Sequence, residues 1–174
     1  YQSAPGVTID PVGQTAIATV SQGTTATATA DSNNVAGSGS LQGTLTITDA
    51  GSGYTSLDPA DLTIGGGGGT GGVITPVITN GQITSLTLSG GSNYTTAPTI
   101  TIAAPDGVAV TITSGGTNYD PTNTYSVNVN GGQQNTAFSG TLVVNSSGIA
   151  TGVSFSNFGE FTNFSGKTTE IEAP

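Results

Sequence analysis

The chain returns three times to one short pattern, which reads Gly51-Ser52-Gly53-Tyr54-Thr55, Gly90-Gly91-Ser92-Asn93-Tyr94-Thr95 and Gly115-Gly116-Thr117-Asn118-Tyr119-Asp120. Tyr54 and Tyr94 lie 40 residues apart, and Phe161 lies 42 residues after Tyr119 in a setting that resembles a fourth return. Self-similarity at a fixed spacing in this range is typical of repeat architectures. The pattern therefore predicts repeated units of about 40 residues.

Between these returns, apolar residues alternate with threonine or serine in short runs, which is the pattern of half-buried strands. The clearest runs are Leu45–Ile47, Leu86–Leu88, Ile100–Ile102, Val108–Thr113, Val127–Val129 and Val153–Phe155. No apolar stripe with the period of a helix survives the density of glycine and threonine. We expect an all-β fold with less than about a tenth of its residues in helices, well below the usual third.

Turn residues punctuate the strands. Asn80-Gly81 suits a two-residue type I′ hairpin. Pro105-Asp106-Gly107 predicts a second hairpin, in which proline presets φ and Gly107 supplies a positive φ, and which joins a strand at 99–103 to one at 108–113. Asn130-Gly131-Gly132 and Ser147-Gly148 are read in the same way. The units should therefore be antiparallel strand and hairpin units, arranged as a β-sandwich or a solenoid.

The spacing divides the chain into unequal segments. We predict four units, at 1–53, 54–93, 94–118 and 119–165, followed by a tail or linker at 166–174. The first unit is long because it carries a flexible inserted loop near 32–40. The third is short because it lacks the middle hairpin. Tyr1–Ile9 lines up with Tyr94–Ile102, so the chain opens on the phase of a repeat and resembles a piece of something longer. All five phenylalanines lie between residues 138 and 164, which predicts a larger aromatic core in the last unit.

The charge and the reactive side chains limit the function. Lys167 is the only basic residue against ten acidic ones, and a single cation cannot neutralise a nucleic-acid backbone or attach the chain to an anionic membrane. No apolar run approaches the roughly 20 residues that span a bilayer. Without histidine or cysteine the chain has no imidazole or thiolate metal site and no thiol or Ser-His-Asp nucleophile. We expect no enzymatic activity, no cofactor and no dedicated metal, with Ca²⁺ as the one plausible ion because it accepts oxygen ligands.

A few residues could carry chemistry, and each has a structural alternative. Asp58 and Asp61 could supply carboxylates to Ca²⁺ or to glycoside chemistry, but a solvated turn with a proline at its corner is favoured. The loop 65–72 lacks the lysine and the helix of a phosphate-binding loop and is read as a connecting loop. The three tyrosines could stack on sugars, but we expect buried rings at equivalent corners, with their hydroxyls bonded to nearby backbone. The sequons Asn93-Tyr94-Thr95, Asn145-Ser146-Ser147 and Asn163-Phe164-Ser165 matter only in a secreted protein.

The glycine-rich tyrosine pattern, together with the alternating strands that follow it, resembles a glycine- and threonine-rich repeat of virion structural proteins from marine tailed phages, especially cyanophages. The match is fullest over Tyr54–Tyr94, its closest stretch is Ile83–Ile102, and it covers residues from about Gly43 to Asn118. It is partial at the N-terminal segment and poor after Tyr119, and similar repeats occur in bacterial surface adhesins. The resemblance implies a tail-fibre-like or particle-surface role and brings no catalytic residues.

The sequence favours a non-enzymatic structural protein of a phage particle, as a fibre, a capsid-surface decoration or a tail accessory component. Its partners would be copies of itself and other virion proteins, with host glycans as a further option. The alternatives are an extracellular adhesin or filament subunit of a cell, joined by strand exchange, and a carbohydrate-binding domain that uses Asp58, Asp61 or the tyrosines. Multiple copies are expected because low charge and few edge lysines leave strand edges unprotected.

Overall fold

A computed structural model describes residues 13–174, so the predicted alignment of Tyr1–Ile9 lies outside the described residues. The described chain contains twelve β-strands, two single-turn 3-10 helices and no α-helix. All strand pairs are antiparallel. The protein is all-β, as the alternation of apolar and polar residues predicts.

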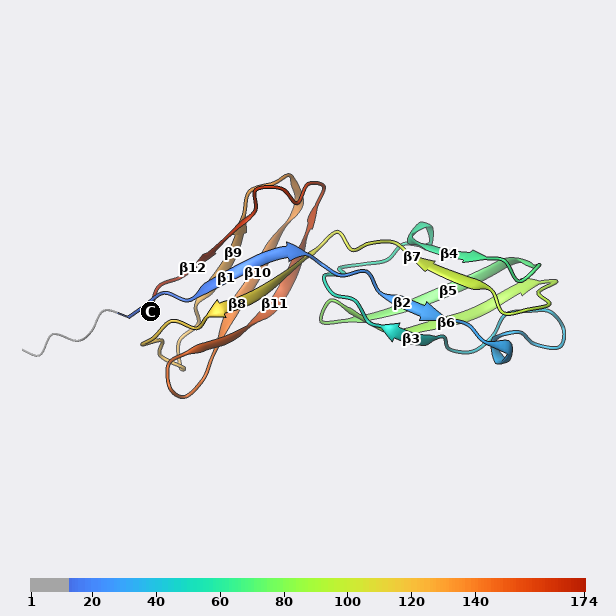
Figure 1. The fold of residues 1–174 in the computed structure, drawn as a ribbon, viewed down its shortest axis with the longest axis horizontal. Helices are drawn as coiled ribbons and strands as arrows, with labels where there is room; N and C mark the ends of the chain where they lie inside the picture. The colour runs from blue at the N-terminus through green and yellow to red at the C-terminus, as the bar shows by residue number, and fades with distance from the viewer. Residues whose placement is uncertain (1–12) are drawn as a thin grey trace, which may run out of the picture.

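The strands form two lobes that lie end to end (Figure 1). The outer lobe contains β1 (Ile17–Gln22), β8 (Val108–Ser114), β9 (Ser126–Asn130), β10 (Gln134–Val144), β11 (Ala150–Phe161) and β12 (Thr168–Ile171). The inserted lobe contains β2 (Thr27–Thr29), β3 (Thr46–Asp49), β4 (Leu62–Gly65), β5 (Thr70–Thr79), β6 (Gln82–Ser92) and β7 (Thr99–Ile102), with the 3-10 turns η1 (Ser32–Asn34) and η2 (Pro59–Asp61). Each lobe has its own hydrophobic core.

The inserted lobe interrupts the outer lobe between two paired strands. β1 pairs with β8, and Gln22 at the end of β1 faces Val108 at the start of β8. The chain therefore leaves the outer lobe after Gln22, builds the whole inserted lobe, and returns at Val108. This nesting accounts for the unequal spacing of the tyrosines, because β1 lies in the predicted unit 1–53 while its partner lies in the short unit 94–118.

The Pro105-Asp106-Gly107 turn is not a hairpin, and that prediction was wrong. β7 before the turn pairs with β4, whereas β8 after it pairs with β1. The two strands belong to different lobes, so the turn carries the chain from one lobe to the other. Gly107 also lacks the positive φ that the hairpin reading assigned to it.

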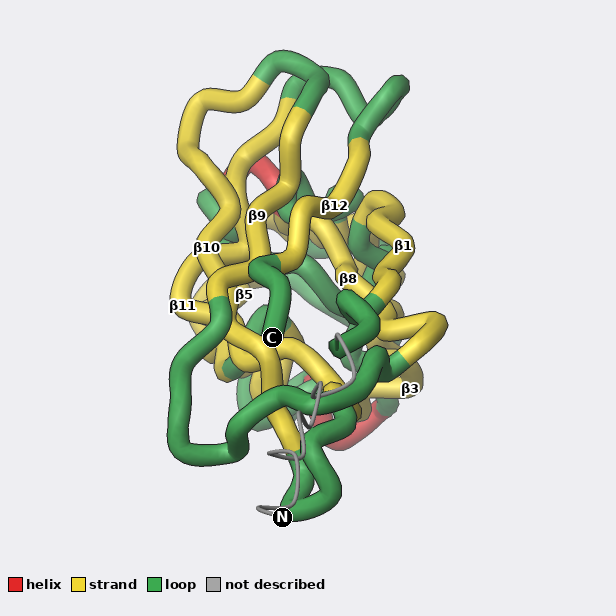
Figure 2. The backbone as a smooth tube through the Cα atoms, turned by 90° about the vertical axis from the view of Figure 1, so that its left-hand side faces the viewer, coloured by secondary structure: helices red, strands yellow, loops and turns green. Residues whose placement is uncertain are grey.

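Both lobes arrange their strands in the same order. The neighbours around the inserted lobe are β2, β3, β6, β5, β4 and β7, and around the outer lobe β1, β8, β11, β10, β9 and β12. Within each lobe the first and last strands of the series are again neighbours. Figure 2 looks along the long axis from the outer lobe and shows β1, β8, β9, β10, β11 and β12 of that lobe arranged around the axis. Backbone ladders do not run through every neighbouring pair, so neither lobe is a closed barrel.

Two segments that the sequence predicted to be irregular are structured. β12, within the predicted tail 166–174, pairs with β9, and the Thr169 hydroxyl donates to the carbonyl of Ala18 at 2.7 Å. The predicted flexible loop near 32–40 is held by Asp31, which accepts from the Asn33 N–H at 2.8 Å. Asn34 is buried there and its side-chain amide donates to the Gln42 carbonyl at 3.0 Å.

Other local predictions hold. Asn80 and Gly81 have φ values of 51° and 73°, which makes the turn between β5 and β6 a type I′ hairpin. The phenylalanines enlarge the core of the outer lobe, where Phe138 and Phe161 are buried and Phe155 and Phe164 pack against them.

The recurring aromatic residues occupy corners at the ends of β3, β6, β8 and β11. Tyr54, Tyr94, Tyr119 and Phe161 are only 1%, 5%, 2% and 2% exposed. Each donates its backbone N–H to a carbonyl in a neighbouring connection, and these bonds are Tyr54 to Gly81 (3.1 Å), Tyr94 to Gly39 (2.9 Å), Tyr119 to Gly148 (3.1 Å) and Phe161 to Asp106 (2.9 Å). The predicted burial of the tyrosines is confirmed, and Phe161 holds the place of a fourth.

Backbone geometry explains the sequence around each tyrosine. The preceding residues Gly53, Asn93 and Asn118 all have φ between 64° and 82°, a region that only glycine and asparagine adopt readily. The glycine three positions before each tyrosine also has positive φ. A Cβ on Gly51 or on Gly91 would lie 2.7 Å from the Cε2 atom of the nearby tyrosine ring. Glycine is therefore required at these positions for the ring to lie against the turn.

The hydroxyls of Tyr54 and Tyr119 make matching pairs of bonds. Tyr54 accepts from the Ala26 N–H at 2.8 Å and donates to the Ala103 carbonyl at 3.0 Å. Tyr119 accepts from the Ala16 N–H at 2.9 Å and donates to the Glu172 carbonyl at 3.2 Å. Each hydroxyl thus joins the start of the first strand of its lobe to the end of the last strand.

Replacing Tyr54 with phenylalanine should lower the free energy of unfolding by about 1–3 kcal/mol, because the buried Ala26 N–H loses its acceptor. Tyr94→Phe is the matched control, since Tyr94 is also buried and bonds to Gly39 through its backbone N–H, which the change leaves in place. Urea unfolding of the two variants checks this. Equal losses would show that the hydroxyl bonds of Tyr54 contribute nothing.

Removing residues 24–105 should leave a folded outer lobe, because Gln22 and Val108 would be joined by a three-residue loop, Gly23-Asp106-Gly107, of hairpin length. The Asp106 carbonyl that accepts from Phe161 is retained. The measurement is the dispersion of the amide signals in a nitrogen–proton NMR spectrum. A collapsed spectrum would contradict the assignment of two separate cores.

Candidate functional site

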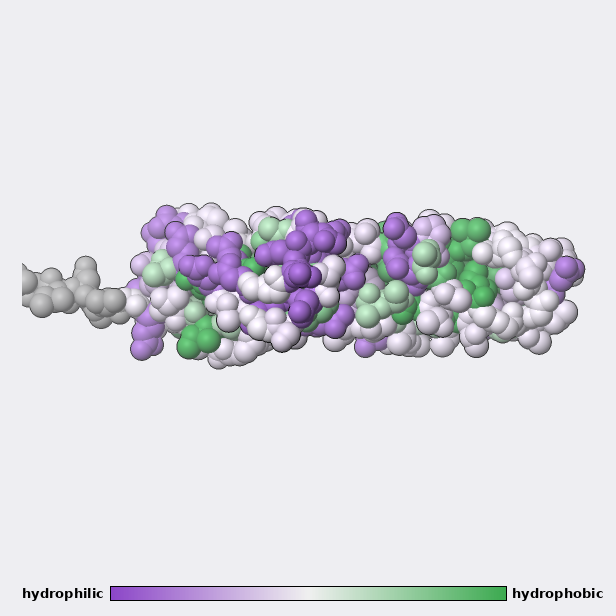
Figure 3. Space-filling model, turned by 90° about the horizontal axis from the view of Figure 1, so that it is seen from above, coloured by the Kyte–Doolittle hydropathy of each residue, from purple (hydrophilic) through white to green (hydrophobic). Residues whose placement is uncertain are grey.

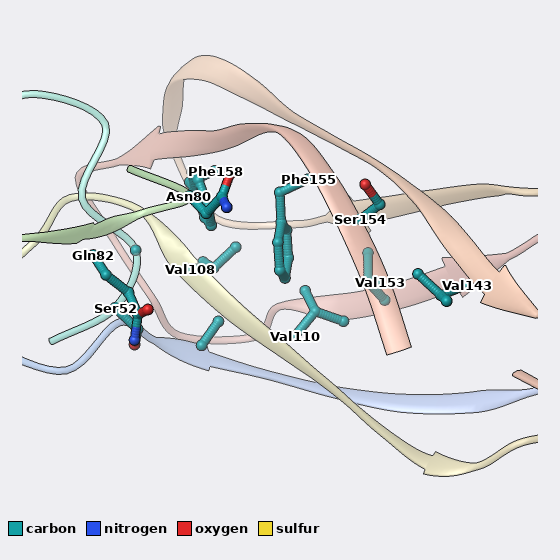
Figure 4. A pocket seen from close by; sticks show the side chains of 12 residues that line it. Ser52, Asn80, Gln82, Val108, Val110, Val143, Val153, Ser154, Phe155 and Phe158 are labelled. Carbon is teal, nitrogen blue, oxygen red and sulfur yellow. The ribbon is translucent and has the colours of Figure 1, made fainter. Parts of the chain in front are cut away.

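The two lobes meet at a pocket of about 570 Å³, which we call the interlobe slot. One end is formed by the inserted lobe and the walls by the outer lobe. Its lining residues are Ser52, Gly53, Asn80, Gln82, Val108, Ala109, Val110, Val143, Val153, Ser154, Phe155 and Phe158. Figure 4 shows the Phe155 ring, which comes from the same strand as Val153, pointing toward β8, which carries Val108 and Val110. The slot is therefore an apolar trough with a few polar groups along its rim.

The slot exists because one seam of the outer lobe is open. In the inserted lobe the matching seam is closed by backbone bonds from Leu45 to Leu86 (2.9 Å) and from Leu88 to Gly43 (2.8 Å). In the outer lobe β8 and β11 are neighbours without a shared ladder, among the described strands. Recorded backbone bonds join this seam near its ends, from Ala150 to Gly115 at 2.8 Å and from Phe161 to Asp106 at 2.9 Å.

A difference in side-chain size accompanies the open seam. Leu88, six residues before Tyr94, is buried in the core of the inserted lobe. Phe155, six residues before Phe161, is only partly buried and stacks on Phe158 with 4.7 Å between ring centroids. The two lobes therefore fill this seam differently, with one leucine in the inserted lobe and with a stacked pair of rings in the outer lobe.

The junction beside the slot depends on close backbone contact. The Gly23 N–H donates to the Gly107 carbonyl at 3.0 Å, and the Gly107 N–H donates to the Gly53 carbonyl at 3.1 Å. The Phe158 ring covers the hairpin turn of the inserted lobe so closely that a Cβ on Gly81 would lie 2.5 Å from its Cζ atom. These glycine positions have no room for a side chain. The close backbone contacts that result fix the two lobes against each other.

The lining of the slot combines apolar side chains with a few neutral polar ones. None of its residues is an acid, a lysine or a tyrosine. Its polar members are two serines, Asn80 and Gln82, and Gln82 already donates to the Gly51 carbonyl at 3.3 Å. The slot can therefore offer apolar contact and a small number of neutral hydrogen bonds.

The sequence-predicted carboxylates do not form such a site. Asp61 accepts from the Asp58 N–H at 2.8 Å and closes the η2 turn, so this pair stabilises the local backbone. Residues 13–174 contain no group of three or more acidic side chains placed to hold a metal ion. The tyrosines do not form a sugar-stacking face, because all three predicted rings are buried.

The glycine-rich loop 65–72 has a structural role that the sequence reading only outlined. It connects β4 to β5 and packs on the Tyr94 ring, which lies where side chains on Gly67 and Gly69 would otherwise project. The Thr95 N–H donates to the Gly67 carbonyl at 2.8 Å, and in the outer lobe Thr162 donates in the same way to Gln133 at 3.0 Å. The loop thus completes the corner around Tyr94.

Two charged groups near the C-terminus have shifted pKa values. The Lys167 ammonium lies 3.5 Å from the centroid of the Phe161 ring and donates to the Asn163 carbonyl at 2.6 Å, and burial lowers its pKa. The Glu172 carboxylate accepts from the Ser126 N–H at 2.9 Å and from the Ser126 hydroxyl at 3.1 Å, and these bonds lower its pKa. Both interactions hold the last strand to the outer lobe and neither lies in the slot.

The slot was not predicted from the sequence. Most of its lining comes from β8 and β11, which are far apart in the sequence and share no motif. The one available signal was the uneven spacing of the tyrosines, since Tyr1 to Tyr54 spans 53 residues and Tyr94 to Tyr119 only 25. This spacing fits an arrangement in which a strand of the long segment pairs with a strand of the short segment. That pairing nests one lobe in the other and creates the junction between them.

Comparison with known proteins gives no relative. No family model, no curated protein and no solved structure matches this chain. Among residues 13–174 there is also no helix with the length and apolar character needed to cross a bilayer.

Replacing Glu172 with glutamine should destabilise the protein more at pH 7 than at pH 3. The folded pKa of Glu172 lies below its unfolded value of about 4.3, so its contribution is present above that value and disappears as the pH falls through the folded pKa. Thermal melting of both proteins across this pH range is the measurement. A difference in melting temperature that does not change with pH would contradict the role of the ionised carboxylate.

Proposed function

We propose that this chain is a non-enzymatic structural component of an extracellular particle, that it acts in many copies, and that the particle is the virion of a tailed phage. The placement of the specific interactions in the molecule supports this most directly. Buried aromatic corners, backbone bonds between lobes and tight glycine contacts all serve to fix an elongated shape (Figure 1). The neutral lining of the slot offers contact rather than reaction.

The surface is suited to repeated contact with neighbours. Figure 3 shows one face on which apolar areas are small and separate, between polar and weakly polar ones. The exposed large apolar side chains of the described residues are Ile17, Val73, Val77, Val143 and Ile149. All lie in strands or beside a hairpin turn, and a chain with one lysine has almost none of the edge charges that block strand pairing. Contact between copies would cover these positions.

The particle itself is tested by locating the protein. An antibody against the recombinant chain, applied with gold label to a lysate of an infected source culture, should mark particles that contain DNA and capsid protein. Label confined to filaments or surfaces of uninfected cells would contradict the phage assignment and favour the cellular adhesin or filament alternative.

Assembly in many copies is tested separately by analytical ultracentrifugation of the recombinant chain across a range of concentrations. We expect association that depends only weakly on salt, since a single lysine cannot build a network of ion pairs. A species that remains monomeric, and that does not bind isolated particles, would contradict this part of the proposal.

A further inference from the structure

We propose that a second pocket at the junction of the lobes binds one ring of a neutral sugar. This junction pocket has a volume of about 320 Å³. The inserted lobe contributes Thr55 and Asn80 to its lining, and the outer lobe contributes Asn157, Phe158 and Glu160. The inference goes beyond the proposed structural role, and it does not depend on which particle or surface carries the chain.

The position of the junction pocket favours a small ligand. It shares Asn80 and Phe158 with the interlobe slot, and Figure 4 shows these two residues together at one end of the slot. Small-molecule sites occur preferentially at such interfaces and usually have volumes of about 300–1,000 Å³, so this pocket suits a single small ring. The close contact of Phe158 with Gly81 keeps the two sides in place before a ligand arrives, which lowers the cost of binding.

The floor of the junction pocket is an aromatic ring held in a stack. Phe158 is partly buried and stacks on Phe155, with 4.7 Å between the ring centroids and 25° between the ring planes. Of the two rings, only Phe158 lines the junction pocket. The face of an aromatic ring carries partial negative charge, and the C–H groups of a sugar ring carry partial positive charge, so the two pack together. The pocket therefore offers an apolar contact to one face of a sugar.

Polar groups around this ring have hydrogen-bonding capacity to spare. Within the described residues, the Thr55 hydroxyl and the Asn80 amide make no hydrogen bond, although both line the pocket. Asn157 accepts from the Gly159 N–H at 2.8 Å through Oδ1, which leaves its two amide N–H groups as donors. Glu160 accepts from a threonine hydroxyl at 3.1 Å through Oε2, which leaves Oε1 as an acceptor. The pocket thus presents both donors and acceptors, as the hydroxyls of a sugar require.

Charge decides which ligands are compatible with the junction pocket. Glu160 is the only charged residue in its lining, and the chain carries a net charge of −9. A phosphate, sulfate or carboxylate group would be repelled there, which excludes nucleotides and acidic sugars. A small cation could contact Phe158 and Glu160, but it would leave the amides and the Thr55 hydroxyl without partners. A neutral hexose uses the ring, the amides and the carboxylate together.

Saturation-transfer NMR on the recombinant chain tests the class of ligand. The probes are the methyl glycosides of glucose, galactose, mannose and N-acetylglucosamine, with a methyl sialoside and choline as the charged comparisons. We expect at least one neutral glycoside to bind and neither charged probe to do so. Saturation that starts from the phenylalanine rings should reach the C–H protons on one face of the bound sugar most strongly, because that face lies on Phe158.

Two conservative variants test the place of binding. Thr55→Val removes a hydroxyl at nearly constant shape, and Glu160→Gln removes a charge at constant size. Each should weaken the affinity for the bound glycoside about tenfold, because each removes a hydrogen bond to the sugar. Thr63→Val, at an exposed threonine of β4, and Glu170→Gln, at a carboxylate of β12 that bonds to Asn130, are the matched controls. Neither control residue lines the pocket, so both should leave the affinity unchanged.

Three results would overturn the proposal. The folded chain might bind none of the four neutral glycosides, or a charged probe might bind as well as the best of them. Equal affinities of the pocket variants and their controls would place the sugar elsewhere. Each of these results leaves assembly in many copies standing, because ultracentrifugation measures that property independently. Conversely, a monomeric chain that binds a neutral glycoside through Thr55 and Glu160 would retain this inference and lose the proposed assembly.

Discussion

The fold depends on one backbone interaction that occurs at four corners, where the N–H of a buried aromatic residue donates to the carbonyl of a neighbouring connection. The bond places the ring beneath the turn, and positive φ at the flanking glycine or asparagine lets the chain bend tightly around it. Each corner thus secures the end of one strand and the connection that leads to another. A chain whose apolar content is only 33% gains from this arrangement, because the rings cover cores built mainly from alanine, valine, isoleucine and leucine.

The same interaction explains how one lobe can be inserted in another without loss of the outer core. In the inserted lobe Tyr94 donates to Gly39, in the connection between β2 and β3 that contains η1. In the outer lobe Phe161 donates to Asp106, at the point where the chain returns from the inserted lobe. The acceptor is preserved although the connection now contains an entire lobe, so the length of the connection matters less than the carbonyl at its end. The close contacts among Gly23, Gly53 and Gly107 then fix the orientation of the lobes.

The sequence predicted what is local and missed what is distant. The Asn80-Gly81 hairpin, the buried tyrosines and the phenylalanine-rich core could be read from turn chemistry and alternation, because each depends on neighbouring residues. The pairing of β1 with β8 could not, since nothing within either strand specifies a partner on the far side of a lobe. The same limit produced the errors at Pro105-Asp106-Gly107 and at 166–174, where good turn and tail signals were overridden by pairing with remote strands. The slot follows from that pairing and from the rings of Phe155 and Phe158, so no motif marks it.

Amide hydrogen exchange at the four corner aromatics tests the central role of these bonds most directly. If the corners hold the lobes together, the N–H groups of Tyr54 and Tyr94 should exchange only when the inserted lobe unfolds, and those of Tyr119 and Phe161 only when the outer lobe unfolds. Their free energies of exchange would then equal the free energy of unfolding of the respective lobe. Exchange at these amides as fast as at the exposed neighbour Thr55 would show that the corners open independently of the cores and would contradict the account.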